Sequence, residues 1–147
     1  MESLDLSDDT DTIIENNGFF PDLSVIYFKK RFRITVAELD VICQNLESAM
    51  YEKNAELRDW VCTQQRQGWQ DLESLLVQYP EYKHYYNTAV YAYAKALLLQ
   101  QHRDKDTTLS GHHRADDLSE TAEDYFDQSR KNINLLIGKP DIWAELL

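Results

Sequence analysis

The chain is poor in glycine, proline and cysteine. Its 147 residues include only four glycines, three prolines and two cysteines. An all-β protein needs more turn residues than this, so the composition favours a helix-rich globular domain. On one continuous helix, Cys43 and Cys62 would lie about 28 Å apart, which is too far for a disulfide. We therefore expect two reduced thiols in a cytosolic protein.

Several functional signatures are missing as well. The sequence has no run of eighteen apolar residues that would predict a membrane-spanning helix. Residues 1–11 are acidic and lack the basic and apolar regions of a signal peptide, so we expect none. A glycine-rich phosphate loop, a Gly-x-Ser-x-Gly motif and a His-Glu-x-x-His motif are also absent. We expect no catalytic residues, no cofactor and no enzymatic activity.

The histidines do not form a pattern typical of metal ligands. His112 and His113 are adjacent, but no cysteine or suitably spaced acid accompanies them, so we expect no metal site. Nearby, Asp116 and Asp117 fall at the expected start of a helix, where carboxylates are favoured in any case. They are interpreted as part of a solvated face.

Acidic residues outnumber basic ones by 26 to 15, which gives a net charge of −11. Such a chain is not drawn to DNA by its overall field. It has one basic cluster, in which two phenylalanines are interleaved: Lys29, Lys30, Arg31 and Arg33. This cluster is a candidate contact for DNA or for an acidic neighbour, either its own subunit's or another's. Both interpretations stay open.

The hydrophobic spacing predicts a series of helices after an acidic segment. Residues 1–17 are expected to be extended or poorly ordered, and Phe19 and Phe20 to fill the core. Helices are expected over residues 25–32 with Asp22 or Ser24 as cap, 36–67 with a capping box from Thr35 to Glu38, 71–79, 81–103 and 114–137. Gly68 and Gly138 suit the positions just past a helix end.

Together these elements predict an all-α fold. The fold is a bundle of about four main helices, with an extended N-terminal arm and an extended C-terminal tail. We place the arm at residues 1–18, the helical domain at 19–138 and the tail at 139–147. The helix from Glu81 to about Arg103, rich in alanine and tyrosine, is expected to be the central core helix because alanines let a second helix approach closely.

The tail is unusually apolar for a chain end. After Gly138 and Pro140 have stopped the last helix, nine residues hold four large apolar side chains, whereas terminal segments are normally polar. The tail therefore either folds back on its own bundle or docks into another chain. The candidate docking residues are Pro140, Ile142, Trp143, Leu146 and Leu147.

Several short motifs occur in a specific order along the chain. They are Phe19-Phe20-Pro21-Asp22; Asn54, Leu57 and Trp60 with Gly68; Ala89-Val90-Tyr91-Ala92-Tyr93-Ala94-Lys95-Ala96; Arg103-Asp104 with Asp106-Thr107; Arg130; and Gly138 with Pro140 before Glu145-Leu146-Leu147. In this order and spacing the sequence resembles the L-type head completion proteins of tailed phages with contractile tails. The resemblance covers nearly everything after residue 18.

The resemblance implies a virion structural protein at the neck between head and tail, assembled in the host cytoplasm. Such adaptors form a ring, usually of twelve copies, beneath the portal protein after DNA packaging. The ring extends the DNA channel and presents a surface to the next connector or tail terminator protein. The tail would dock to the portal. Carboxylates facing the channel would let packaged DNA pass without sequence-specific binding.

Two alternatives come from other functional classes. An acidic DNA mimic would bind a basic partner tightly in a salt-sensitive way, and would not need Trp143. A regulator of the packaging motor would change nucleotide hydrolysis by that motor. Dependence on the tail separates the adaptor from the mimic.

Overall fold

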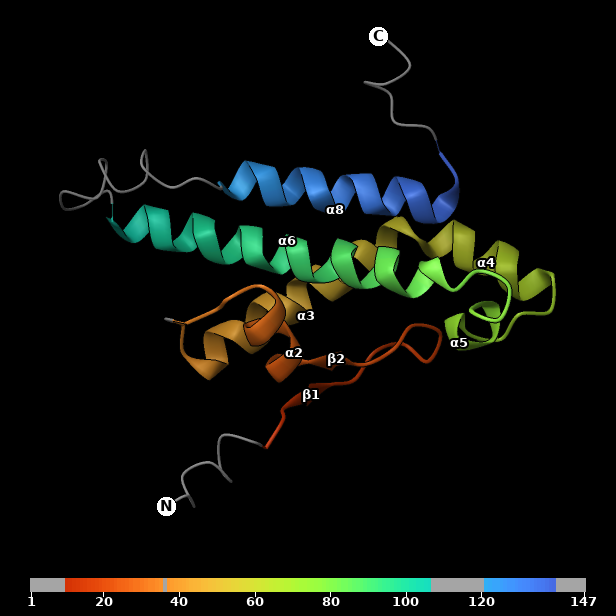
Figure 1. The fold of residues 1–147 in the computed structure, drawn as a ribbon, viewed down its shortest axis with the longest axis horizontal. Coiled ribbons are helices and arrows are strands. Elements are labelled where there is room, and N and C mark those ends of the chain that lie inside the picture. The colour runs from red at the N-terminus through yellow and green to blue at the C-terminus, as the bar shows by residue number, and fades with distance from the viewer. Residues whose placement is uncertain (1–9, 36, 107–120, 140–147) are drawn as a thin grey trace, which may run out of the picture.

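The computed structural model describes residues 10–35, 37–106 and 121–139, and this part of the chain is mostly helical (Figure 1). Its elements, in chain order, are β1 (Ile13–Ile14), β2 (Leu23–Ser24), α2 (Val25–Arg31), α3 (Leu39–Glu56), α4 (Arg58–Arg66), α5 (Leu72–Leu75), α6 (Glu81–Asp106) and α8 (Ala122–Ile137). The coarse prediction of a helical fold is confirmed. The small sheet was not expected.

Helix α6 is the centre of the domain, as its alanine-rich sequence predicts. Ala89, Ala92 and Ala96 are completely buried, and α8 runs antiparallel alongside this helix (Figure 1). The Ser129 hydroxyl of α8 donates a hydrogen bond of 2.6 Å to the backbone oxygen of Ala89. Such a contact requires the two backbones to lie close together. The small alanine side chains leave room for that approach.

Helix α3 packs against α6 from behind in the view of Figure 1. The expected helix over residues 36–67 is present as two helices, α3 and α4, which are separated at Leu57. The Leu57 side chain is fully buried. The break brings Trp60 of α4 within 6.1 Å of Phe19, measured between ring centroids. The break thus coincides with packing of Trp60 on Phe19, and no glycine or proline marks it in the sequence.

The start of α3 also differs from the prediction. The helix begins at Leu39, after Glu38, whose backbone is extended and whose side chain makes no capping hydrogen bond. The expected capping box from Thr35 to Glu38 is therefore wrong. Glu38 instead lines a groove with residues of α6 (described below).

Residues 10–17, the described part of the predicted N-terminal arm, pack against the rest of the domain. Ile13 and Ile14 of β1 pair antiparallel with Ser24 and Leu23 of β2. Ile14 is buried. The Asp11 carboxylate accepts hydrogen bonds from the Ser24 hydroxyl and the Ile26 backbone N–H. These contacts are long-range in sequence, so local composition did not reveal them.

Helix α2 begins as predicted, with Ser24 as its cap. The Ser24 hydroxyl accepts a hydrogen bond of 3.0 Å from the Tyr27 backbone N–H. At the other end, Arg33 has a left-handed backbone (φ 54°), and the Ile34 N–H donates to the Lys29 carbonyl oxygen. This is the Schellman type of helix end, in which glycine is the usual residue.

The remaining helix ends confirm two predictions and correct one. Gly68 and Gly138 follow α4 and α8 with φ values of 100° and 79°, the left-handed conformation expected of them. Helix α8, however, begins at Ala122 and not near residue 114. Thr121 is its cap and forms a capping box with Asp124, in which each side chain bonds the other residue's backbone N–H. Asp116 and Asp117 lie outside the described residues.

The core forms mainly around α6, between the N-terminal segment, α3 and α8. Phe19 and Phe20 are buried in it, which confirms the prediction that they fill the domain's own core. The Phe20 ring stacks on Tyr86 at 4.0 Å. Within the residues described, no helix combines the length and the apolar character that crossing a membrane requires.

Candidate functional site

The tail predicted to dock lies outside the described residues. This applies to Pro140, Ile142, Trp143, Leu146 and Leu147, and also to His112 and His113. The structure does fix where the tail leaves the domain. Lys139 follows the left-handed Gly138 at the end of α8, and its backbone N–H donates to the Asn134 carbonyl oxygen.

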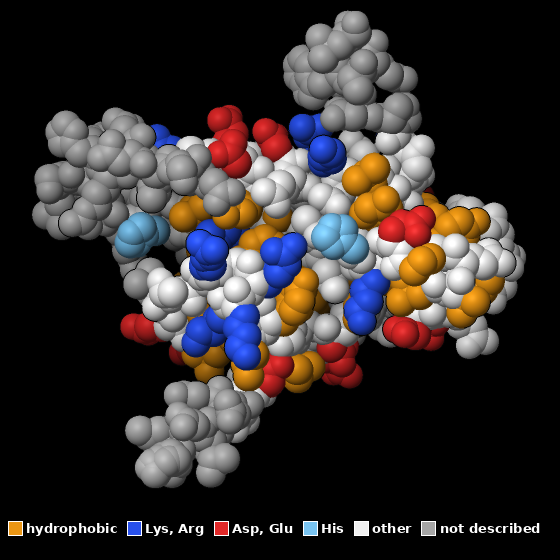
Figure 2. Space-filling model, in the orientation of Figure 1, with side chains coloured by type: hydrophobic (Ala, Val, Ile, Leu, Met, Phe, Trp, Pro, Cys, Tyr) orange, Lys and Arg blue, Asp and Glu red, His pale blue; other side chains and the backbone are white. Residues whose placement is uncertain are grey.

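The basic cluster lies on one exposed turn. Lys29, Lys30 and Arg31 form the last turn of α2, where positive charge is favourable beside the helix C-terminus. All three side chains are exposed. Figure 2 shows Lys and Arg side chains gathered on the face that carries α2 and α6. A concentration of positive charge on one face of a net acidic protein indicates an interaction surface.

Buried aromatic rings hold this turn in place. Phe28 is fully buried, and its ring lies 5.8 Å from that of Tyr91 in α6. The Ser24 backbone N–H donates a hydrogen bond of 2.8 Å to the Tyr91 hydroxyl. Burial raises the pKa of Tyr91 to about 12, so its hydroxyl stays protonated at neutral pH. The cluster thus rests on a rigid support.

A groove lies between the segment after α2 and the C-terminal half of α6. We call it the α6 groove; its cavity volume is about 450 Å³. It is lined by Arg33, Ile34, Thr35, Ala37, Glu38, Val41, Lys95, Leu98, Leu99, Gln101 and His102. Five of these side chains are apolar, and three of the four ionisable ones are basic residue types. The α6 groove therefore combines an apolar floor with a mainly basic rim.

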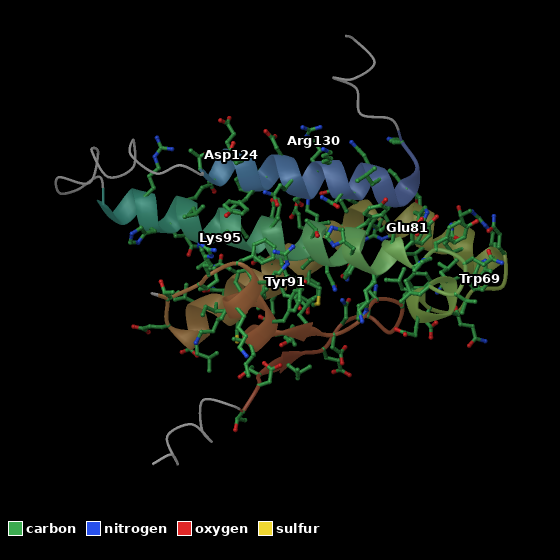
Figure 3. All side chains as sticks on the ribbon, viewed as in Figure 1. Trp69, Glu81, Tyr91, Lys95, Asp124 and Arg130 are labelled. Carbon is green, nitrogen blue, oxygen red and sulfur yellow. The ribbon has the colours of Figure 1, made fainter. Side chains whose placement is uncertain are left out.

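The fold brings the rim together from distant parts of the chain. Arg33 is exposed at the end of α2, while Lys95 and His102 come from α6. Lys95, labelled in Figure 3, also lies with its Nζ 5.8 Å from the ring centroid of Tyr125 in α8. Sequence analysis identified Arg33 but missed the α6 residues. Leu98 carried no separate signal because it belongs to the apolar stripe that the core helix was expected to bury.

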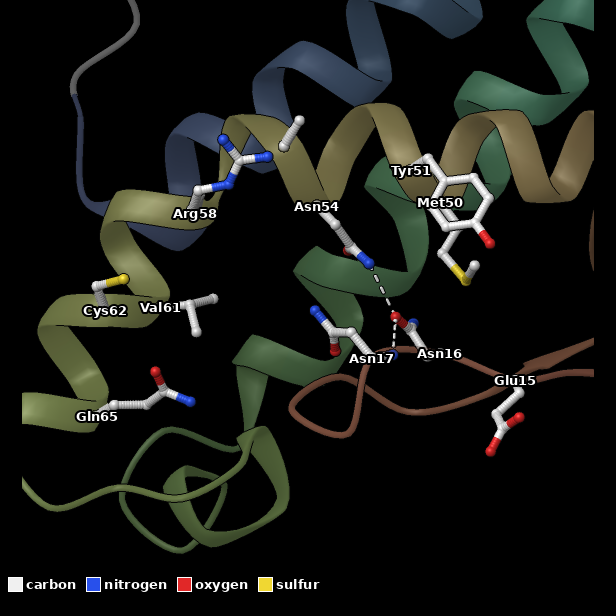
Figure 4. A pocket seen from close by; sticks show the side chains of 11 residues that line it. Glu15, Asn16, Asn17, Met50, Tyr51, Asn54, Arg58, Val61, Cys62 and Gln65 are labelled. Atoms are coloured by element: carbon white, nitrogen blue, oxygen red, sulfur yellow. Dashed lines mark hydrogen bonds between the residues drawn. The ribbon is translucent and has the colours of Figure 1, made fainter.

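A second pocket, of about 430 Å³, lies where the N-terminal segment meets α3 and α4 (Figure 4). Its lining includes Asn16 and Asn54, whose side chains hydrogen bond to each other at 2.8 Å. Asn16 also donates to the Tyr86 hydroxyl, which in turn donates to Asn54. The three polar groups satisfy one another, so they hold the N-terminal segment on the helices and offer little to a ligand.

The structure shows little that resembles acid–base or metal chemistry. Among the residues it describes, no three His, Cys, Asp or Glu side chains come together as a candidate metal site. Burial, with Glu47 and Asp40 nearby, raises the pKa of Cys43 and so lowers the reactivity of its thiol. The second cysteine, Cys62, is also free.

Comparison with known proteins identifies the family. The family described as phage head completion protein (GPL) matches residues 14–147. The head completion/stabilization protein of Escherichia phage P2 is 29% identical over 140 residues, which cover 87% of this chain and 79% of that protein. No solved structure matches the chain. These findings confirm the resemblance seen in the motifs, and the chain belongs to the phage head completion protein family.

Proposed function

We propose that this head completion protein is a head-to-tail adaptor. Its copies form a ring, with twelve as the expected number, beneath the portal protein after DNA packaging. The ring extends the DNA channel and provides the docking surface for the next connector or the tail terminator protein. The protein acts in the neck of the virion, after assembly in the host cytoplasm, and its mechanism is binding.

The observation that carries this proposal is the extent of the family match. It runs from residue 14 to residue 147 and so includes the helical domain and the apolar tail together. A tail that belongs to the family's common sequence, and that is rich in large apolar side chains, suits a docking element. We assign the tail to the portal, with Trp143 as its main anchor because large aromatic residues dominate the energetics of most interfaces.

The positions of the two candidate contact regions suit an adaptor. The tail leaves the domain at the end of α8, whereas the α6 groove lines the C-terminal half of α6. Because α8 runs antiparallel along α6, these two regions lie at opposite ends of the helix pair (Figure 1). A protein that joins two different partners needs contact regions that both partners can reach at once.

The charge of the chain suits a channel wall. At a net charge of −11, the subunits of a ring would repel the phosphate backbone, so DNA would pass without binding to a specific sequence. Lys29, Lys30, Arg31 and Arg33 are the exception, and we propose them as a contact with a neighbouring copy or with DNA. A DNA contact would weaken steeply as salt is added, whereas the tail contact, being mainly apolar, would not.

The test is co-sedimentation with DNA-filled heads that lack tails. Full-length protein should sediment with the heads, and the variant Trp143→Ala should be lost from them. The matched control is Val77→Ala, since Val77 is 87% exposed and lies outside the tail. If Trp143→Ala binds as well as the unchanged chain, the tail is not the anchor. If even the unchanged chain fails to bind, the adaptor proposal fails, and the acidic mimic becomes the better explanation.

A further inference from the structure

We propose that the α6 groove receives the C-terminal tail of a second copy of this chain. The proposal rests on the proposed function in one respect, namely that the tail is a docking element. In the free protein the groove of one copy shelters the apolar side chains of another copy's tail. The portal then competes for the same tail during assembly.

The groove and the tail are complementary in chemistry. The floor of the α6 groove is apolar, with Val41, Leu98 and Leu99 among its lining residues. The tail offers large apolar side chains of matching character. Burial of such groups against each other is the main driving force for association.

The charges are complementary as well. The groove's rim carries two basic side chains, Arg33 and Lys95, against one acid, Glu38. Residues 140–147 have the opposite character, because their charged side chains are those of Asp141 and Glu145. Opposite charges around an apolar contact set orientation and exclude wrong partners.

The register of α6 and α8 puts this groove far from the point where the same chain's tail begins. Ser129 contacts Ala89, and the rings of Phe126 and Tyr93 lie 5.0 Å apart, so residue numbers in α8 fall as those in α6 rise. In this register the end of α8 lies beside the start of α6. Leu98 is then about 24 Å further along the helix axis, at about 1.5 Å per residue.

The chain beyond α8 is too short to cover that distance with its aromatic residue. Trp143 is five residues past Gly138, so its Cα atom reaches at most about 18 Å even when the chain is fully extended. Among the tail's large apolar residues, only the final two leucines have the backbone length to reach the level of Leu98 in their own chain. A second copy has no such limit. Its tail can approach the groove with Trp143 as well as with the leucines.

This arrangement would protect the free protein from aggregation through its apolar tail. Four large apolar side chains on an exposed tail would favour aggregation before the portal is met. A groove on a second copy shields them reversibly, because each copy has both a tail and a groove. The resulting contact is between unlike surfaces, which is the kind of contact that also closes rings.

Sedimentation of the full-length chain over a range of concentrations tests the proposal. We expect concentration-dependent self-association. Its association constant should fall about tenfold or more in Trp143→Ala, because a buried aromatic anchor is removed. Arg33→Glu should also weaken it, and adding Glu145→Lys to Arg33→Glu should restore part of the loss. The matched control, Lys83→Glu, changes an exposed lysine of α6 outside the groove and should have no effect.

A synthetic peptide of residues 139–147 provides a measurement that needs no variant. Added in excess, it should compete for the groove and shift the full-length chain toward monomer. A chain that stays monomeric at every concentration would overturn the proposal, and so would self-association that neither Trp143→Ala nor the peptide reduces. The adaptor proposal is judged separately, by whether the unchanged chain sediments with DNA-filled heads, whatever its state of self-association in free solution.

Discussion

The Tyr86 hydroxyl donates a hydrogen bond of 2.7 Å to the side-chain oxygen of Asn54, inside the domain and between α6 and α3. Asn16 completes the arrangement, because its amide donates to the same hydroxyl at 2.9 Å and accepts from Asn54 at 2.8 Å. Three segments far apart in the sequence are thus joined by one set of mutually satisfied polar groups. Burial raises the pKa of Tyr86, so the hydroxyl remains a donor.

Removing this hydroxyl should destabilise the fold. In Tyr86→Phe, the amides of Asn16 and Asn54 each lose a partner in a part-buried site, which costs about 1–3 kcal/mol of the free energy of unfolding. Urea denaturation measures the change. Tyr85→Phe is the matched control, because Tyr85 is partly exposed and its hydroxyl makes no hydrogen bond among the described residues. Equal effects of the two substitutions would show that the network adds no stability.

The contact between α6 and α8 should be sensitive to the size of the side chain at position 89. Ala89 is completely buried, and its carbonyl oxygen accepts from Ser129 at 2.6 Å. Ala89→Leu would force the two helices apart and should lower the free energy of unfolding by about 1–3 kcal/mol. Ala55→Leu, at an exposed position of α3, should leave it nearly unchanged. Thermal unfolding of both variants checks this, and tolerance of Ala89→Leu would argue against a close helix contact.

Stability should depend on alkaline pH through Tyr91. Burial raises the pKa of this group from 10.0 to about 12 in the folded protein. The folded state therefore holds the proton more tightly than the unfolded state. The stabilisation is fully present below pH 10 and is lost as the pH rises through the interval up to about 12.

Tyr91→Phe removes that titration. Its free energy of unfolding should be lower than that of the unchanged chain at pH 7, because the Ser24 N–H loses its acceptor. It should then fall less steeply above pH 10. Denaturation curves collected at intervals from pH 7 to high pH should show the free energies of unfolding of Tyr91→Phe and of the unchanged chain converging. Parallel pH profiles would mean that Tyr91 ionises equally easily in both states.

The left-handed backbone of Arg33 gives a prediction with a closely matched pair. In a residue with a Cβ atom, this conformation lowers the stability of the folded state by about 1–2 kcal/mol, whereas in glycine it does not. Arg33→Gly should therefore be more stable than Arg33→Ala by about 1 kcal/mol, although both lose the same charge. Both should weaken self-association alike. If alanine and glycine give the same stability, the backbone at this position is not strained.

Local signals in the sequence were sufficient to predict helix starts and ends that depend on a single residue. Ser24 caps α2 through its own side chain, and Gly68 and Gly138 adopt backbone angles that other residues rarely tolerate. The alanine spacing likewise predicted the central helix. Each of these features depends on groups within a few residues of one another, which is why composition and spacing reveal them.

Features that depend on distant partners could not be predicted in this way. The break at Leu57 coincides with packing of Trp60 on Phe19 and Phe20, about forty positions earlier. At the start of α8, Thr121 and Asp124 carry a capping signal, but the acids at residues 116 and 117 resembled a helix start equally well. The α6 groove escaped prediction because Ile34 and Leu98 meet only in the folded chain.

The position of Asn16 also has a consequence for how the chain folds during synthesis. Its partner Tyr86 lies 70 residues later, so the N-terminal segment emerges from the ribosome long before its binding site in α6 exists. Phe20 cannot reach its final packing before Tyr86 is made either, since its ring stacks on the same tyrosine. The adjacent Phe19 is subject to the same delay. Contacts of such long sequence separation form slowly. Residues 16–20, although made before α6, are therefore among the last to reach their final place.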